Sequence, residues 1–419
     1  MLINFTFSNH LSFRDEANVS FEATSFRKKT ENYRKVNDQK ILSSLAIYGA
    51  NASGKSNVID ALQFAVNFIT NSSSSKPTNK IKTKPYLLDS ISDCLPSKFT
   101  FEFLFKTKTY RYSFSVSKEE VLYENLEMYN REEALYFDLF LRKNRRITLN
   151  ENKMLDRDII GKTRSNVLFL SALAQWNNKL ALGITDWFDS ISFIDNNNID
   201  RMLPSIEAVV DLLSDQLLDS VKTADFGIES IAMGDDNTAK DLPDDMPKQL
   251  KDLILSGDIK QFPDYKTVHA KYNDKNEKVG SVEFSLLENE SDGTKKFISI
   301  LPLLLYTLTK GGILVIDELE NYLHPLLVKY IIDFFHNKNL NKRAQLLMTT
   351  HDVHLLDADV FRCDQLYIAS KDKFGASELY SLTDFENIEY IKKKELSLYY
   401  LSGKFGGVPM LNKHGFIKG

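Results

Sequence analysis

The pattern of apolar and polar residues predicts an alternation of strands and helices along the chain. Two early strands are indicated, one by the alternation in LINFTF and one by the short apolar run SLAIYG. An amphipathic helix follows in NVIDALQFAVNFIT, where apolar residues recur at helical spacing. A β-hairpin is predicted between Lys98 and Val116, because strong alternation flanks the polar turn KTKT.

The last third of the chain continues this alternation. A strand, a polar turn and an apolar helix are predicted over EKVGSVEFSLLENESDGTKKFISILPLLLYTL. After them come the buried strand GGILVIDELE, the amphipathic helix NYLHPLLVKYIIDFFHNKN, the buried strand AQLLMTTHD and a closing strand pair in DQLYIASKD and SELYSL. Apolar strands that alternate with helices favour a mostly parallel sheet covered on both faces. The predicted fold class is therefore α/β.

The middle of the chain has no such regular pattern. From Glu119 to Tyr272, short helical and strand patterns are mixed with the charged segment MGDDNTAKDLPDDMPKQ, and we find neither a sustained heptad nor an internal repeat. We therefore predict one domain in two parts, residues 1–118 and 276–419, separated by a mostly helical insertion at residues 119–275.

Composition narrows the classes of protein. The 419 residues are 43% hydrophobic and 26% charged, which is ordinary for a globular chain. The only two cysteines, Cys94 and Cys363, are too isolated for a disulfide framework or a CxxC metal site, and we expect both to be buried. The N-terminus lacks an export signal and no window reaches about eighteen consecutive apolar residues, so we expect a cytoplasmic protein with no membrane partner. A net charge of −4 argues against a protein that coats nucleic acid.

The candidate chemistry begins in the loop between the second predicted strand and the first helix. The sequence GANASGKS matches GxxxxGK[ST], in which backbone amides cradle phosphates, the lysine meets the outer phosphates and the hydroxyl ligates Mg²⁺. The strand before the loop and the helix after it place the anion at a positive helix N-terminus, which favours nucleotide binding over a chance glycine-rich turn. The candidate nucleotide-binding residues are Gly49, Asn51, Ala52, Ser53, Gly54, Lys55, Ser56 and Asn57.

Two acids end the next buried strand. Asp317 can support Mg²⁺ together with Ser56, and Glu318 can orient a hydrolytic water. The alternative is an ordinary apolar strand that ends in two charged residues. Because the chain also contains the phosphate-binding loop described above (the P-loop), we favour the catalytic interpretation. His351 ends the following strand and can reach a γ-phosphate. His354 raises the alternative of a metal-binding histidine pair, which we discount because no third convergent ligand is in view.

A short polar motif precedes the apolar helix of the last third. Ser291-Asp292-Gly293-Thr294 combines a hydroxyl, a glycine that allows close backbone approach and a helix N-terminus, which suits an anion. The alternative is an ordinary helix N-cap by Ser291 or Asp292. The motif resembles the signature of ABC-type ATPases, in which a serine hydroxyl and a glycine amide bind the γ-phosphate held by the P-loop of the other subunit. It departs from the transporter form LSGGQ at Glu290, Asp292 and Thr294.

The order of these motifs resembles one family. The P-loop, the signature, VIDELENYLHP, TTHD and the ending YLSGKFGGVP are together similar to the AAA15 or AAA_21 group of ABC-type ATPases, related to the RecF, SMC and OLD proteins and including abortive-infection L and Rlo-type phage-defence ATPases. The resemblance covers the ends of the chain well and the middle poorly. It implies an ABC-type head, with a mostly parallel sheet and an antiparallel β lobe, split by the insertion, and two heads that close on two ATP molecules.

The resemblance also implies roles for individual residues. It makes Glu318 the general base, His351 the switch, and Ser291 and Gly293 the residues that act in trans. It makes Lys55 and Ser56 the residues that bind phosphate and Mg²⁺, and Asp317 a residue that supports Mg²⁺.

Further positions follow from the same resemblance. Gln175 in FLSALAQWNN is the candidate for the glutamine that senses the γ-phosphate. Residues Asn321 to Pro325, with His324, match the dimer-contacting stretch after the acids. Candidates beside the adenine come from FSNHLSFRDE and are Asn9, Ser12 and Phe13.

Three functions compete on these grounds. The first is a homodimeric ATPase sensor in defence against phage that controls a separately encoded effector, a nuclease. The second is a RecF-like repair ATPase, for which the basic cluster in YFDLFLRKNRRITLNENK would offer nucleic acid as a partner, although a solvated helix face explains it about as well. The third is a transporter motor, which the signature and the lack of a membrane segment disfavour. After His351 too little chain remains for the nuclease domain of an OLD-type protein, so we predict no intrinsic nuclease.

Overall fold

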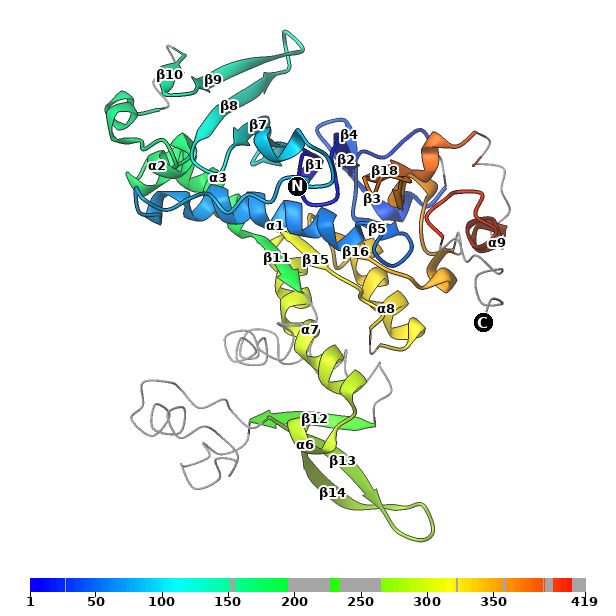
Figure 1. Ribbon diagram of the computed structural model, residues 1–419. Helices are drawn as coiled ribbons and strands as arrows, with labels where there is room; N and C mark the ends of the chain where they lie inside the picture. Colours follow the sequence, from blue (N-terminus) through cyan, green and yellow to red (C-terminus); the bar gives the residue numbers. More distant parts are fainter. Residues whose placement is uncertain are drawn as a thin grey trace, which may run out of the picture. The chain divides into compact units, whose positions relative to one another are not determined.

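Contacts between residues divide the chain into two units (Figure 1). The first unit comprises Met1–Ile194, Thr307–Glu320 and Val328–Gly419, and the second comprises Asp195–Tyr306 and Asn321–Leu327. The computed structural model describes residues 1–26, 28–150, 155–194, 227–233, 265–321, 323–356, 359–386, 388 and 395–408.

Six strands of the first unit form a mostly parallel sheet. Their order is β11 (Ile191–Ile194), β15 (Ile313–Ile316), β16 (Gln345–Thr349), β5 (Ser44–Tyr48), β17 (Leu366–Lys371) and β18 (Ser377–Ser381). The first five run parallel, and β18 is antiparallel to β17. Every residue of β5, β15 and β16 is buried, as expected for strands covered on both faces. The predicted α/β class and the predicted closing strand pair are confirmed.

Seven strands of the same unit form an antiparallel sheet. Their order is β10 (Arg146–Leu149), β9 (Leu135–Lys143), β8 (Val121–Asn130), β7 (Lys108–Val116), β6 (Ser97–Phe105), β1 (Leu2–Ser8) and β2 (Ala17–Ser20). The period of two places Phe99, Phe101 and Phe103 of β6 in the core, with half-exposed residues between them. The hairpin predicted between Lys98 and Val116 is the pair β6–β7.

One hydrophobic core joins the two sheets and the helix α1 (Lys55–Asn71). Helix α1 turns Val58, Leu62 and Ala65 toward this core, and Figure 1 shows it running between the antiparallel sheet and the parallel sheet. The remaining elements of the unit are β3 (Tyr33–Val36), β4 (Gln39–Leu42), α2 (Phe169–Gln175), α3 (Lys179–Asp189) and α9 (Leu396–Leu401). Helix α8 (Pro325–His336) begins in the second unit and ends in the first.

The second unit contains a small antiparallel sheet and the start of a long helix. Its strands are ordered β12 (Ile228–Met233), β13 (Tyr265–Tyr272) and β14 (Lys278–Ser285). The short helix α6 (Leu286–Asn289) follows, and then α7 (Asp292–Lys310), the predicted apolar helix.

The predicted insertion differs from the structure at its start. The boundary at residue 118 falls inside the antiparallel sheet, because β8 to β10 continue that sheet to Leu149. In contrast to the mostly helical prediction, β8, β9 and β10 make residues 121–149 three strands joined by turns, and the first unit continues to Ile194. Most of the remaining insertion lies outside the described residues.

Buried charges concealed this strand pattern. Glu124 of β8 and Arg142 of β9 are buried, with Arg142 Nη1 3.6 Å from Glu124 Oε2. Glu124 also accepts the backbone N–H groups of Phe169 and Leu170 at the start of α2, at 2.7 and 2.9 Å. Prediction from the hydrophobic pattern treats charged residues as exposed. A charged side chain can nevertheless be buried when it is paired and hydrogen-bonded in this way.

Two expectations from composition can be compared with the structure. Among the residues described, no helix combines the length and apolar character needed to cross a membrane. The prediction that both cysteines are buried is wrong for Cys94, which is exposed, while Cys363 is half-buried.

Candidate functional site

The predicted P-loop connects β5 to α1 at the carboxyl edge of the parallel sheet. Two glycines are required by its path. A Cβ on Gly49 would lie 2.4 Å from the Ala369 carbonyl oxygen, and Gly54 has a φ of +111°. A Cβ on Gly54 would also lie 2.5 Å from Ser377 Oγ. The two glycines therefore let the loop backbone pack closely against β17 and β18, and the loop ends at the positive N-terminus of a 17-residue helix.

The lysine of the P-loop is held inside the loop. Lys55 is buried, and its Nζ donates to the carbonyl oxygens of Gly49 (2.9 Å) and Ala50 (3.0 Å). Burial lowers the pKa of the Lys55 ammonium, and nearby carboxylates oppose that change. The buried Ser53 Oγ has no hydrogen-bond partner among the described residues. A cradle with a cation and an unsatisfied hydroxyl suits a phosphate group.

Hydroxyl groups of Ser12 and Ser377 form hydrogen bonds that connect the P-loop to neighbouring segments. Ser377 Oγ donates to the Ser53 carbonyl oxygen (2.7 Å) and lies 2.7 Å from Ser12 Oγ, and Asn57 Nδ2 donates to Ser12 Oγ (2.6 Å). The structure thus brings the predicted Ser12 and Asn57 together at the loop. Sequence reasoning missed Ser377, because its distance of more than 300 positions from the loop leaves no local signal.

The other N-terminal candidates have structural roles. Asn9 is buried, and its side chain bonds the backbone of Ser92, Leu95 and Tyr86 at 2.8–2.9 Å. Phe13 is fully buried in the core. Neither side chain is available to an adenine, so these two predictions are corrected.

The acidic pair lies beside the P-loop because β15, β16 and β5 are parallel neighbours. Thr349, the last residue of β16, binds both acids: its Oγ1 donates to Asp317 Oδ1 (2.5 Å) and accepts the Glu318 N–H (2.8 Å). Glu318 has a φ of +52°, a left-handed conformation that costs a non-glycine residue about 1–3 kcal/mol. Backbone strain of this kind concentrates at functional sites, and here Thr349 holds it in place.

His351 and a third acid complete this edge. His351 Nε2 lies 3.3 Å from Glu318 Oε1, and the His351 backbone N–H donates to Glu320 Oε1. Glu320 Oε2 is buried without a hydrogen-bond partner among the described residues. The negative charges of Glu318, Asp317 and Glu320 are those that raise the Lys55 pKa against burial. Sequence reasoning singled out two acids of VIDELE and missed Glu320, although it lies two positions from Glu318.

The residues present fit a magnesium ion. Ser56 is exposed in the first turn of α1, and the carboxylate of Asp317 belongs to the same carboxyl edge. Mg²⁺ prefers oxygen ligands and is commonly held by one or two protein groups together with substrate phosphates. The described residues contain no group of three or more His, Cys, Asp or Glu side chains that could hold a metal by itself. His354 is exposed and belongs to no such group.

The comparisons with known proteins agree with this geometry. The family described as "AAA domain, putative AbiEii toxin, Type IV TA system" (AAA_21) matches residues 44–357, which is more than half of the chain. The chain belongs to the AAA_21 family. None of the curated proteins compared with it matches.

The solved structures that resemble this AAA_21 chain include heads of SMC proteins. The SMC head domain from Thermotoga maritima is 15% identical, with 91% of this chain and 98% of that chain covered and a TM-score of 0.43. An Smc head bound to the C-winged helix domain of ScpA is 14% identical, with 93% and 99% covered and a TM-score of 0.46. An Smc head with an extended coiled coil, bound to the C-terminal domain of ScpA derived from Pyrococcus furiosus, is 12% identical, with 96% and 99% covered and a TM-score of 0.40.

The signature motif of the AAA_21 chain begins helix α7 in the second unit. Ser291 is exposed, its Oγ accepts the Thr294 N–H (3.1 Å) and it lies 2.8 Å from Thr294 Oγ1. This is the N-cap geometry that we considered as the alternative. Gly293 is half-buried in the first turn. A role of Ser291 and Gly293 in trans remains a prediction, which the exposure of the helix N-terminus permits.

The stretch after the acids supports the signature helix within the second unit. Lys296, one turn into α7, is buried, and its Nζ donates to the Asn321 carbonyl oxygen. His324 and Pro325 are exposed at the start of α8, where His324 Nδ1 accepts the Leu326 N–H (3.3 Å). The predicted dimer-contacting stretch therefore has an exposed side and a buried attachment to α7.

Gln175 lies at the wrong end of α1 for its predicted role. The Ser73 N–H donates to Ser171 Oγ of α2 (3.1 Å), so α2 packs beside the C-terminal end of α1. The 17 residues of α1 separate that end from the P-loop by about 25 Å. Gln175 is exposed there and cannot reach a phosphate held by Lys55, so the prediction is withdrawn.

The end of β11 lies next to the end of β15 in the parallel sheet. Ile194, at the end of β11, pairs with Ile316 of β15, so the chain leaves β11 beside the acidic pair. The residues that follow, DNNN at positions 195–198, lie outside the described part of the chain.

Proposed function

We propose that this AAA_21 protein is a Mg²⁺-dependent, cytoplasmic ATPase that closes as a homodimer and regulates a separate effector in defence against phage. One observation carries the ATPase part of the proposal. A P-loop with a buried lysine, a strained glutamate and a histidine in contact with that glutamate converge on one edge of a parallel sheet. Ligands of open α/β sheets bind at this edge, outside the carboxyl ends of the strands.

Each residue has a part in the hydrolysis. The backbone amides of the P-loop and the Lys55 ammonium bind the β- and γ-phosphates, while Ser56 and Asp317 hold the magnesium ion. When bound, magnesium neutralises charge that develops on the phosphate oxygens. Glu318 accepts a proton from the attacking water, and His351 orients the Glu318 carboxylate through the contact at 3.3 Å.

Thr349 and Glu320 position these groups. The Thr349 hydroxyl fixes the position of the Asp317 carboxylate and of the Glu318 backbone by a hydrogen bond to each. Glu320 holds the backbone of His351. Both residues act through others and make no contact with the substrate in this scheme.

The dimer completes the site. The exposed N-terminus of α7 offers the Ser291 hydroxyl and the Gly293 amide to the γ-phosphate bound by a second copy. ATP then holds the two heads together, and hydrolysis releases them. The family description, which names a toxin–antitoxin system, supports a role in defence, and the separate nuclease effector is our extension of that role.

Light scattering of the Glu318→Gln variant tests the dimer. We expect its mass to double on addition of ATP and Mg²⁺, because the substitution removes the base and keeps the shape. The double variant with Ser291→Ala should remain a monomer. A mass that ATP does not change, together with unaltered ATP hydrolysis in Ser291→Ala, would leave Ser291 as an N-cap only.

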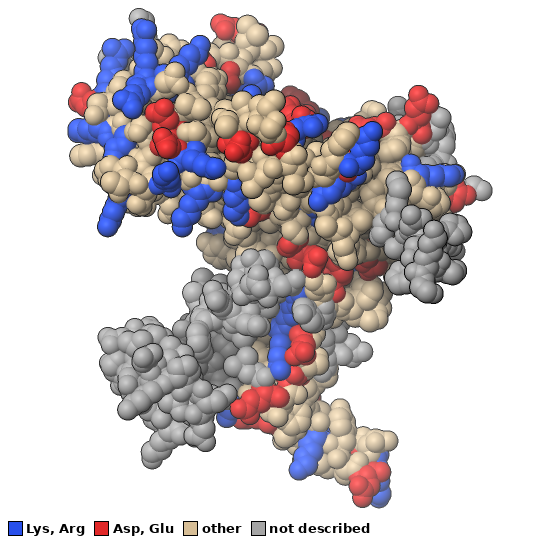
Figure 2. Space-filling model, viewed as in Figure 1, with Lys and Arg blue, Asp and Glu red and all other residues tan. Residues whose placement is uncertain are grey.

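A RecF-like DNA-binding ATPase is the second candidate. Lys and Arg side chains gather over the part of the first unit that carries β9, β10 and α2 (Figure 2). Addition of short duplex DNA to the closed dimer separates the two functions, because a stable complex favours the repair class and an unchanged mass favours the partner-controlling sensor.

A further inference from the structure

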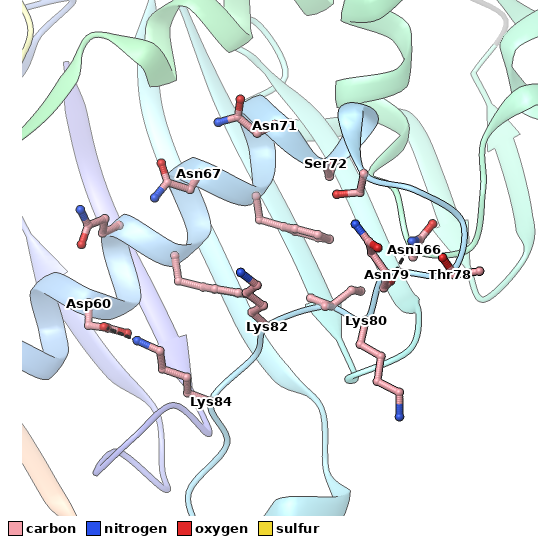
Figure 3. Close-up of a pocket in the computed structure, with 15 residues that line it drawn as sticks. Asp60, Asn67, Asn71, Ser72, Thr78, Asn79, Lys80, Lys82, Lys84 and Asn166 are labelled. Atoms are coloured by element: carbon pink, nitrogen blue, oxygen red, sulfur yellow. Dashed lines mark hydrogen bonds and ion pairs between the residues drawn. The ribbon is translucent and has the colours of Figure 1, made fainter. Parts of the chain in front are cut away.

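A groove with a volume of about 850 Å³ runs along the side of α1. Its first wall is one face of α1, with side chains at helical spacing from Asp60 to Asn71, of which Phe64 and Phe68 also pack against the edge of the core. Its second wall is the irregular segment 75–84, which follows α1 in the chain (Figure 3). The volume lies within the range of ligand-binding pockets, about 300–1,000 Å³, and exposed residues on both walls leave the groove open.

The second wall carries a row of cations. Lys80, Lys82 and Lys84 are exposed while Ile81 between them is buried, so the lysines share the outer side of an extended segment. Alternate residues in such a segment are roughly 6.6 Å apart, a spacing close to that of successive phosphates in a stretched single strand. Figure 3 shows the Lys82 amine pointing toward α1 and the Lys84 amine reaching Asp60, whose Oδ2 it approaches to 2.5 Å.

Two carboxylates oppose these lysines, Asp60 inside the groove and Glu119 outside it. Asp60 is the acidic side chain of the lining, and its charge is shared between Lys84 and His10 Nε2, which lies 2.8 Å from Asp60 Oδ1. Glu119, outside the lining, lies with its Oε1 3.8 Å from Lys80 Nζ, so three ammonium groups face two carboxylates and the groove keeps an excess positive charge in a chain whose net charge is −4. The groove therefore favours an anionic ligand.

The first wall carries flat apolar surfaces and amides. Phe64 and Phe68 lie half-buried on successive turns of α1, with ring centroids 5.9 Å apart and planes within 7° of each other. Aromatic faces beside cations are the features that bind the bases and backbone of single strands without regard to sequence. Asn67 and Asn71 are exposed on the same face and can hydrogen-bond base edges.

A buried acceptor lies unsatisfied at the end of the groove. Asn166 is 4% exposed, and its Nδ2 donates to the carbonyl oxygens of Lys76 and Asn79, both at 3.0 Å. Its Oδ1 has no hydrogen-bond partner among the described residues. Figure 3 shows Asn166 beside Asn79 at the lining. A ligand group that donates a hydrogen bond, such as a sugar hydroxyl or a base amine, would satisfy it.

We propose that this α1 groove binds single-stranded nucleic acid. The phosphates lie along Lys82 and Lys84, bases stack on Phe64 and Phe68, and the exposed asparagines contact base edges. An acidic peptide would use the lysines and leave the aromatic faces and amides without a function, which is why nucleic acid is the better match. The proposal does not rest on ATP hydrolysis, because none of these residues belongs to the nucleotide site.

Fluorescence anisotropy of the full chain with labelled single-stranded oligothymidylate and oligouridylate tests the groove. We expect salt-dependent binding, with Lys82→Glu weakening the affinity roughly tenfold and reducing the salt slope by about 0.7, the value for one phosphate contact in a single strand. Phe68→Leu keeps an apolar side chain, removes the aromatic face and should weaken binding by a similar factor. The matched control is Lys108→Glu, at an exposed position of β7 outside the groove, which should bind within about twofold of the parent chain.

The alternative outcomes are distinct. Equal losses in Lys82→Glu and Lys108→Glu would overturn the location, since net charge alone would then explain the binding. Equal competition by polyglutamate, or binding of free mononucleotides but not of the oligomers, would overturn the single-strand ligand, as would no binding at all. Retained oligonucleotide binding in Lys55→Ala would show that the groove and not the P-loop holds the strand, whereas loss in that variant would overturn the proposal even if ATP hydrolysis proceeds as proposed.

Discussion

The P-loop at the N-terminus of α1 and the α1 groove along its side differ in the kind of groups that form them. At its N-terminus the P-loop is made of backbone groups, buried side chains and two glycines whose positions tolerate no Cβ. Along one face of the helix, the α1 groove is made of side chains, most of them exposed or half-buried, from α1 and segment 75–84. The difference teaches that a backbone site fails as a unit, whereas a side-chain site loses affinity one contact at a time.

The largest effect is expected at Glu318. Glu318→Gln should lower ATP hydrolysis by about 10²–10⁴-fold and leave ATP binding intact, because the general base is lost and the shape is kept. Steady-state phosphate release and equilibrium binding of labelled ATP measure the two properties separately. The matched control is Glu378→Gln on β18, an exposed glutamate outside the site. Normal hydrolysis in Glu318→Gln would remove Glu318 from the mechanism.

Gly54→Ala tests whether the P-loop fails as a unit. Its φ of +111° and the contact of the new Cβ with Ser377 Oγ should strain the loop and lower nucleotide affinity by roughly 10²-fold. Gly161→Ala is the matched control, because a Cβ there meets nothing within 4 Å. Titration with a fluorescent nucleotide measures both variants. Equal affinities would mean that the loop adapts, and the contrast with the groove would disappear.

Thr349→Val tests the hydroxyl that joins the two acids. The substitution keeps the shape and removes a charge-assisted hydrogen bond to Asp317, so hydrolysis should fall about tenfold or more. Thr349→Ser restores the hydroxyl and should recover most of the rate. A normal rate in Thr349→Val, or no recovery in Thr349→Ser, would show that the acids are held by other contacts.

His336 makes the parallel sheet sensitive to acid. Burial lowers the pKa of its imidazole from 6.5 to about 3, and His336 Nε2 contacts Ser44 Oγ at the start of β5 (2.7 Å). The unfolded chain then binds more protons between pH 6.5 and 3, so this contribution is complete above pH 6.5 and is lost as pH falls through that window. The loss amounts to at most about 1.4 kcal/mol per pH unit.

His336→Gln should flatten this pH dependence. Urea unfolding at pH 7 and pH 5 measures it, with His324→Gln, an exposed histidine, as the control. A pH dependence that is unchanged in His336→Gln would assign the acid sensitivity to other groups.

The smallest effect is expected in the α1 groove. Asn67→Asp adds one negative charge at an exposed position of α1 and should weaken single-strand binding a few-fold, with ATP hydrolysis unchanged. Asn276→Asp makes the same change on an exposed turn of the second unit. A loss of ATP hydrolysis in Asn67→Asp would show that the groove and the P-loop behave as one site.

Local patterns predicted most of the first unit. The alternation in β1, β6 and β7, the apolar runs of β5, β15 and β16 and the helical spacing in α1 are each visible within ten to twenty residues. The extension of the antiparallel sheet through β8 to β10 was missed, because Glu124 and Arg142 interrupt the apolar pattern and are neutralised by partners elsewhere in the chain.

The sequence by itself determined the P-loop, the acidic pair and His351, because each is a short motif with a strand beside it. Only the tertiary structure decided that Gln175 lies at the far end of α1, that Ser377 supports the P-loop and that Thr349 joins the two acids. The same holds for the α1 groove, whose lining comes from a helix face, the following segment and Asn166. The physical reason is that motifs act through neighbours in the chain, whereas these contacts join residues that only the packing of sheets and helices brings within hydrogen-bonding distance.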